Sequence, residues 1–143
     1  MADILLDFPI NVPATKVFAA ISTPAGLDQW WTMTSAGAPA PGNTYELYFG
    51  PPYDWRAIIS KCVPDTDFEF EMTVADEDWR HTRVGFALAM KDGITQVRFH
   101  HSGWPAVNEH YRISSFCWAM YLRVLRRHLE HGERVPYELR LDV

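Results

Sequence analysis

Two polar residues lie among apolar ones, at positions from which they could hold a ligand or carry a proton. His101 shares the alternating parity of Val97 and Phe99, so we expect its imidazole on the inner face of a strand. Because histidine titrates near neutral pH, His101 is the one candidate for a catalytic acid or base. Two other interpretations stay open: a buried histidine satisfied by backbone or a tyrosine hydroxyl, and a polar contact to a ligand.

Ser114 is a small polar residue on the apolar side of a predicted helix. A side chain this small leaves space beside the helix. Its hydroxyl needs a hydrogen-bond partner, which is either a ligand or the carbonyl one turn earlier. Apolar and aromatic residues of inward parity complete the predicted ligand-binding set, although core packing explains each of them taken singly. The set is Tyr45, Phe70, Met72, Phe86, Leu88, Phe99, His101, Ser114, Trp118, Tyr121 and Leu122.

Sequence motifs for other chemistry are absent. The chain has no G-x-S-x-G, no glycine-rich phosphate loop and no H-E-x-x-H. His100 and His101 have opposite parity, and His128 with His131 lacks a third ligand, so we expect no metal and no other cofactor. We expect a binding protein more than an enzyme. A cyclase or hydratase, in which a shaped pocket orients the substrate around His101, is the alternative.

The elements that must position these residues follow from the hydrophobic period. Alternation over Ile4–Ile10 predicts a half-buried strand. Helical spacing after Pro13 and again after Pro24 predicts two short helices, the second running to Trp31. The small and polar residues 32–43 predict a loop that either gates a cavity or simply connects elements.

From Thr44 onward the period is two, which predicts the strands of an antiparallel sheet with one wet face. The apolar alternation covers residues 45–49, 55–63, 68–74, 84–90 and 95–101, and Asp92-Gly93 predicts a tight hairpin turn before the last of them. From about Ala106 to His131 the period is helical, roughly 39 Å long, and Gly132 is the expected C-cap.

This order predicts an α+β fold in one domain over residues 1–143. A curved antiparallel sheet of about six strands surrounds a long C-terminal helix, and two short helices follow the first strand. A straight helix cannot contact all of a twisted sheet, so we expect either a cavity or a crowded aromatic core between them. Aromatic residues make up 14% of the chain, which suits both outcomes.

Composition excludes several classes of partner. The formal charge of -5 and the pI near 5.6 argue against nucleic-acid binding. No apolar run approaches the ~20 residues that span a bilayer, and the N-terminus lacks the pattern of a signal peptide, so we expect a cytoplasmic protein with no membrane insertion. Cys62 and Cys117 are expected to be reduced thiols, with a disulfide between them as the alternative.

Charge is spread unevenly along the chain. Acids outnumber bases 12 to 4 through Arg80, whereas bases outnumber acids 9 to 6 from His81 onward. The split is typical of a solvated acidic surface on the first strands and a mildly basic helix, and a docking face for a partner is the alternative. Phe116 lies near the charged sector of the helix, where it marks either a self-association or partner patch or an isolated exposed ring.

Several segments resemble a known superfamily. The opening FPINVPATKVFAAISTPAGLDQWW resembles the start of the START-like, or helix-grip (SRPBCC), superfamily. The segments HTRVGFAL, TQVRFHHSGW and WAMYLRVLRRHLEHG are similar to its subfamily named for the activator of the heat-shock-protein-90 ATPase. The resemblance runs from Phe8 to about Gly132 and implies the helix-grip fold. It is much less specific for function, because the superfamily includes lipid, sterol and hormone carriers, polyketide cyclases and co-chaperones.

The leading functional hypothesis is a module that binds an apolar or amphipathic small molecule, lipid-like or polyketide-like, between the sheet and the helix. The first alternative is a co-chaperone-like interaction domain of the activator type, tied to stress response and contacting a chaperone or a second copy. The second alternative is the cyclase or hydratase.

Overall fold

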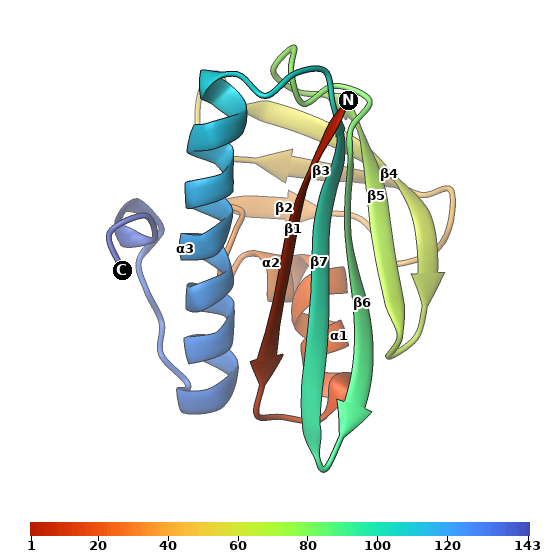
Figure 1. Ribbon diagram of the computed structural model, residues 1–143, viewed down its shortest axis with the longest axis vertical. Coiled ribbons are helices and arrows are strands. Elements are labelled where there is room, and N and C mark those ends of the chain that lie inside the picture. The colour runs from red at the N-terminus through yellow and green to blue at the C-terminus, as the bar shows by residue number, and fades with distance from the viewer.

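The hydrophobic alternation forms one seven-stranded antiparallel sheet in the computed structural model, which describes residues 1–143 (Figure 1). The strands are β1 (Ala2–Ile10), β2 (Thr34–Ala36), β3 (Thr44–Tyr48), β4 (Asp54–Val63), β5 (Asp67–Val74), β6 (Arg83–Lys91) and β7 (Ile94–Trp104). The helices are α1 (Ala14–Ser22), α2 (Pro24–Leu27) and α3 (Glu109–His131), followed by a 3-10 turn, η1 (Tyr137–Leu139). The sheet order is β1-β7-β6-β5-β4-β3-β2.

The sheet curves around the long helix. In Figure 1 β1 runs beside α3, with β7 and β6 next along the sheet, whereas β3 and β2 cross behind β1 and β7. Register shifts near Arg56 and Ile59 interrupt the pairing of β4 with β5, and such bulges bend a strand and increase its twist. The helix α1 contacts β5, β6, β7 and α3, so it fills part of the concave face. The predicted helix-grip fold is confirmed.

The number of strands was underestimated at about six. The additional strand, β2, lies inside segment 32–43, which the sequence predicted to be a loop. It has three residues and pairs Thr34 with Tyr48 and Ala36 with Glu46 of β3. Its small residues carry no alternating pattern. We attribute its formation to the free backbone edge of β3, which offers partners to any adjacent extended segment.

Two helix boundaries also differ from the prediction. The second helix ends at Leu27 rather than Trp31, and hydrogen-bonded turns continue to Thr32. The long helix begins at Glu109 rather than Ala106, because the side-chain oxygen of Asn108 accepts the Tyr111 N–H at 2.9 Å and caps it there. Its end is as predicted: Gly132 takes a left-handed conformation, with φ of 69°.

Aromatic rings fill much of the space between α3 and the sheet. The indole of Trp118 is 1% exposed and lies 4.6 Å from the ring of Phe99, 5.2 Å from Trp31 and 5.8 Å from Trp79, measured between ring centroids. Offset contacts of this kind stabilise a core beyond the area they bury. Of the two predicted alternatives, a cavity or a crowded aromatic core, the region around Trp118 therefore forms the crowded core.

Candidate ligand-binding site

His101 is fully buried in a closed chain of hydrogen bonds. The Trp118 indole N–H donates to its Nδ1 at 3.0 Å, and its Nε2 lies 2.8 Å from the Thr82 hydroxyl oxygen. That hydroxyl in turn donates to the Trp79 carbonyl, so Nε2 must carry the proton that joins His101 to Thr82. Each donor has one acceptor. The chain holds the imidazole in a single neutral tautomer, with a threonine and a tryptophan in place of the expected backbone or tyrosine partner.

The same burial disfavours the protonated form of His101, so the imidazole is neutral near neutral pH. Desolvation, and then the nearby charges of His100 and His110, lower the pKa of His101 from 6.5 to about 3. A general base works best with a pKa near the working pH. His101 also does not line the cavity described below. Neither observation favours His101 as a catalytic acid or base, and that role stays a prediction.

Most of the predicted ligand-binding set lies inside the packed core. The hydroxyl of Tyr45 donates to the Ser22 carbonyl, and its side chain is fully buried. Leu122 is buried at the floor of a groove between α3 and β1. The buried members that pack within the apolar core are Phe70, Met72, Phe86, Leu88, Phe99 and Trp118. Of the set, Ser114 and Tyr121 line the mainly aromatic cavity described next, whereas Leu122 and Phe99 each line a separate surface groove. Ligand contact by every member of the set stays a prediction.

That cavity has a volume of about 280 Å³ and lies beside the N-terminal half of α3. Nine of its eleven lining residues are hydrophobic. The walls come from the end of the α2 turn, the β3–β4 turn, β4, the β5–β6 loop, α3 and η1. The lining residues are Trp31, Phe49, Tyr53, Trp55, Trp79, His110, Ile113, Ser114, Cys117, Tyr121 and Tyr137.

Trp79 forms the wall that sequence reasoning missed. It directly follows the acidic run 76–78 in the loop between β5 and β6. Asp78 accepts hydrogen bonds from the Asn108 amide at 3.1 Å and pairs with His110 at 3.2 Å, so the loop is fastened to the start of α3. Trp79 is thereby turned inward, where it stacks on Trp118. A tryptophan directly after three acids was the available signal, since large rings rarely stay solvated.

Two hydroxyl groups on α3 supply the polar character of the cavity. Ser114 accepts the Trp79 indole N–H at 3.3 Å, so its own proton is free to donate, and it does not bond back to the preceding turn. Tyr121 has no hydrogen-bond partner, and burial first of all raises its pKa to about 12, so it remains a phenol that can donate. Residues seven apart share one side of a helix, so both hydroxyls face the cavity. Together they suit a ligand with a hydrogen-bond acceptor.

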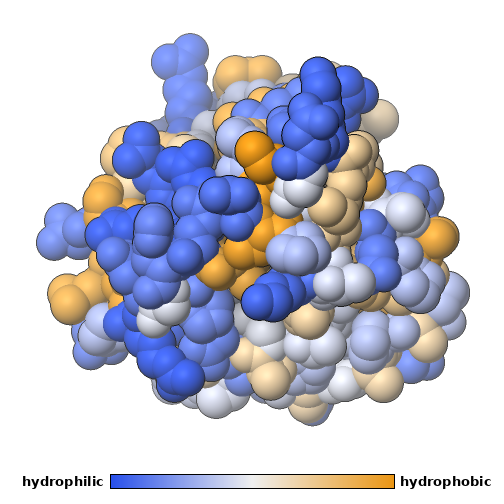
Figure 2. Space-filling view, turned by 90° about the horizontal axis from the view of Figure 1, so that it is seen from below, coloured by the Kyte–Doolittle hydropathy of each residue, from blue (hydrophilic) through white to orange (hydrophobic).

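A second, outer groove of about 200 Å³ lies between β1 and the second half of α3. Leu6, Phe8 and Ala119 form part of its apolar lining, and Arg123 and Arg126 also border it. Figure 2 looks at the molecule from below and shows a hydrophobic strip between hydrophilic areas at this end. Three of the seven residues lining the groove are charged, so its lining is less apolar than that of the aromatic cavity.

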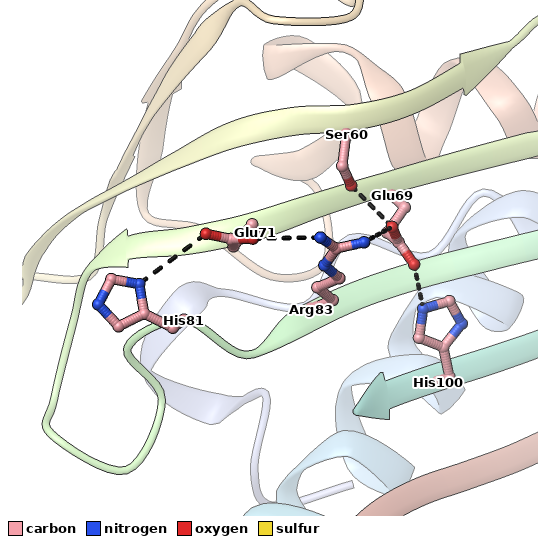
Figure 3. Close-up of polar contacts among 6 residues, drawn as sticks. All are labelled: Ser60, Glu69, Glu71, His81, Arg83 and His100. Atoms are coloured by element: carbon pink, nitrogen blue, oxygen red, sulfur yellow. Dashed lines mark hydrogen bonds and ion pairs between the residues drawn. The ribbon is translucent and has the colours of Figure 1, made fainter. Parts of the chain in front are cut away.

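A cluster of charged and polar side chains occupies the opposite, convex face of the sheet (Figure 3). Glu69 accepts from the Ser60 hydroxyl at 2.8 Å and pairs with His100 at 2.8 Å across β6. The reach is possible because Gly85 has no side chain: a Cβ there would lie 2.5 Å from the His100 ring. Burial would raise the pKa of Glu69, but these bonds and the charges of His100 and Arg83 hold it below its ordinary value. The cluster therefore joins β5, β6 and β7 by ion pairs and adds β4 through the Ser60 hydrogen bond.

The structure gathers no three His, Cys, Asp or Glu side chains in an arrangement that could hold a metal ion. Cys62 and Cys117 are both free and half-buried, so the alternative of a disulfide between them does not form. None of the helices combines the length and the apolar character that a membrane crossing requires.

Comparison with known proteins agrees with this architecture. The family described as Activator of Hsp90 ATPase homolog 1-like protein matches residues 11–130, which is most of the chain. The chain belongs to this family. The resemblance found in the sequence is thereby confirmed, and the C-terminal segment after α3 lies outside the matched residues.

Solved structures match the chain over nearly its whole length. A solution structure described as the Aha1 dimer from Colwellia psychrerythraea is 28% identical with a TM-score of 0.84, covering 93% of this chain and 99% of that one. A Mesorhizobium loti protein is 18% identical with a TM-score of 0.82, at 92% and 99% coverage. CalU16 from Micromonospora echinospora is 18% identical with a TM-score of 0.74, at 97% and 80% coverage. The last two show the fold alone. A comparison with curated proteins gives no match.

Proposed function

We propose that this protein binds a small, planar, mostly apolar molecule carrying a hydrogen-bond acceptor, in the cavity beside the N-terminal half of α3. The observation that carries the proposal is the unpartnered Tyr121 hydroxyl in a cavity with mainly aromatic walls. The hydroxyl is accessible from the cavity and has no partner in the protein, so it can donate to a ligand acceptor. The helix-grip fold of the family fits ligand binding of this kind.

The cavity volume narrows the ligand class. Pockets for drug-sized ligands span about 300–1,000 Å³, and this cavity of about 280 Å³ lies at the lower end. The rings of Trp55 and Trp79, 5.0 Å apart between centroids, offer flat surfaces to a fused aromatic system. We therefore expect two or three fused rings with a carbonyl or ether oxygen, rather than a full-length lipid or a sterol.

The test compares 2-acetylnaphthalene with 2-ethylnaphthalene, which has a similar shape but no oxygen. We expect saturable quenching of tryptophan fluorescence by both, with tighter binding of the ketone. Replacing Tyr121 with Phe should weaken the ketone about fivefold to tenfold and leave the hydrocarbon unchanged.

Tyr48→Phe is the matched control, because Tyr48 is also half-buried but lies outside the cavity. If neither probe binds saturably, the ligand-binding proposal is wrong. Equal affinities of ketone and hydrocarbon, unchanged in Tyr121→Phe, would remove only the role of the hydroxyl.

The exposed face of α3 supports a second candidate, association with another protein or a second copy. Phe116 is 63% exposed and Ile113 is 54% exposed, and their spacing of three places them side by side on the helix. The Colwellia psychrerythraea relative is described as a dimer, which favours self-association. Sedimentation velocity over a range of concentrations tests this. We expect Phe116→Ser to reduce the dimer fraction and Leu5→Ser, an exposed apolar change on β1, to leave it unchanged.

A further inference from the structure

The C-terminal tail, defined as residues 133–143, lies against α3 on the side away from β1 (Figure 1). It follows the Gly132 cap, contains η1 and extends beyond the family match, which ends at residue 130. Val135 and Val143 pack against the apolar core. The tail is therefore an ordered part of the molecule rather than a loose end.

Tyr137 is the residue of the tail that reaches the cavity beside α3. Its ring is one of the lining residues, and its hydroxyl donates to the Phe49 carbonyl at 3.0 Å, at the end of β3. The tail thus crosses from the side of α3 to the end of β3. Tyr137 and Cys117 line the same cavity, so the tail forms part of its wall.

Arg140 fastens the tail to the segment after α2. Its side chain is 6% exposed, and the guanidinium donates to three backbone carbonyls: Asp28 at 2.7 Å, Thr32 at 3.0 Å and Val135 at 3.2 Å. No carboxylate pairs with it. A buried cation is costly unless hydrogen bonds replace its water, so these carbonyls hold Arg140 in one place.

We infer that the C-terminal tail is the wall that sets ligand size in the proposed site, with Tyr137 as the wall residue and Arg140 as its anchor. The inference rests on the proposed function, because it concerns the size of the ligand. Its test uses no ligand and so does not depend on that function. Cys117 lines the same cavity, so the reactivity of its thiol reports how large a molecule can enter.

The experiment measures alkylation of Cys117 in the full-length Cys62→Ser protein, with iodoacetamide as the small reagent and N-(1-pyrenyl)maleimide as the large one. The ratio of the two rates cancels changes in the thiol's own acidity. In Tyr137→Ala and in Arg140→Met we expect the large reagent to react about tenfold faster and the small one no more than about threefold faster, because local opening governs access. Arg134→Met, an exposed arginine of the same tail without ion pairs, is the control and should match the parent.

A ratio unchanged in both Tyr137→Ala and Arg140→Met would overturn the inference. Circular dichroism checks that each variant is folded, and Tyr137→Ala preserves the test if the loss of Arg140 unfolds the protein. The outcome is independent of the naphthalene titrations. The tail can therefore fail as a wall while ligand binding stands, and ligand binding can fail while the tail still limits access.

Discussion

The two sides of α3 that face the protein interior are packed very differently. On one side, Trp118 is enclosed by rings and donates to His101, and every polar group in that chain has a partner. On the other, Ser114, Cys117 and Tyr121 border open space. Residue size explains part of the contrast, since serine and cysteine leave volume that tryptophan and leucine fill. The contrast shows that one amphipathic helix can supply both a closed core and a cavity wall.

Replacing Trp118 with Ala should have the largest effect on stability. It removes a fully buried ring and leaves the Nδ1 acceptor of His101 without a partner, so we expect a loss of about 3–5 kcal/mol in the free energy of unfolding. Urea denaturation measures the loss. Ile113→Ala, at an exposed position at the edge of the open side, should change it by less than about 0.5 kcal/mol. Similar losses in both variants would contradict the division of the helix into two sides.

Replacing His101 with Gln tests the closed hydrogen-bond chain through pH. The folded-state pKa of about 3 lies below the ordinary 6.5, so between these values the unfolded chain takes up a proton that the folded protein does not. The parent should therefore lose up to about 1.4 kcal/mol per pH unit as pH falls below 6.5, with no such loss above it.

The glutamine variant keeps a donor and an acceptor but does not titrate, so its stability should fall less steeply between pH 6.5 and 4.5. Urea denaturation at a series of pH values gives both slopes. Identical slopes would mean that His101 takes up a proton in the folded protein, and that the chain is open.

Filling the open side should have a small effect on stability and a clear effect on binding. Cys117→Phe places a ring into the cavity, and we expect the unfolding free energy to change by no more than about 1 kcal/mol. Affinity for 2-acetylnaphthalene should fall at least about tenfold, measured by fluorescence quenching. Cys62→Phe is the matched control at a half-buried cysteine outside the cavity. Equal binding by Cys117→Phe and the parent would place the probe elsewhere.

Much of the fold could be predicted because its signals are local. Alternation with period two identified the strands from β3 to β7, and Asp92 and Gly93 adopt the positive φ angles, 54° and 79°, that a tight hairpin turn requires. The amphipathic period and the Gly132 cap gave the long helix and its end. The strand β2 was missed because three small residues show no period, and only a neighbouring free edge makes them a strand.

The site was predicted less well for a physical reason. Parity and helical spacing state which side chains point inward, and on this basis Trp118, Phe99 and Ser114 were correctly placed inside. They do not state whether facing side chains fill the space between them, because that depends on residues distant in the chain. Trp79 reaches Ser114 from 35 positions away, and Tyr137 reaches Phe49 from 88.

The sequence by itself therefore determined the order of the elements, the inward face of each strand and the apolar side of α3, since these depend on periodicity. Only the tertiary structure decided that the space around His101 is closed and that the space around Tyr121 is open. The β5–β6 loop and the C-terminal tail produce this difference, because they place Trp79 and Tyr137 against the helix. Neither placement follows from local pattern, because each depends on side-chain contacts between segments far apart in the chain.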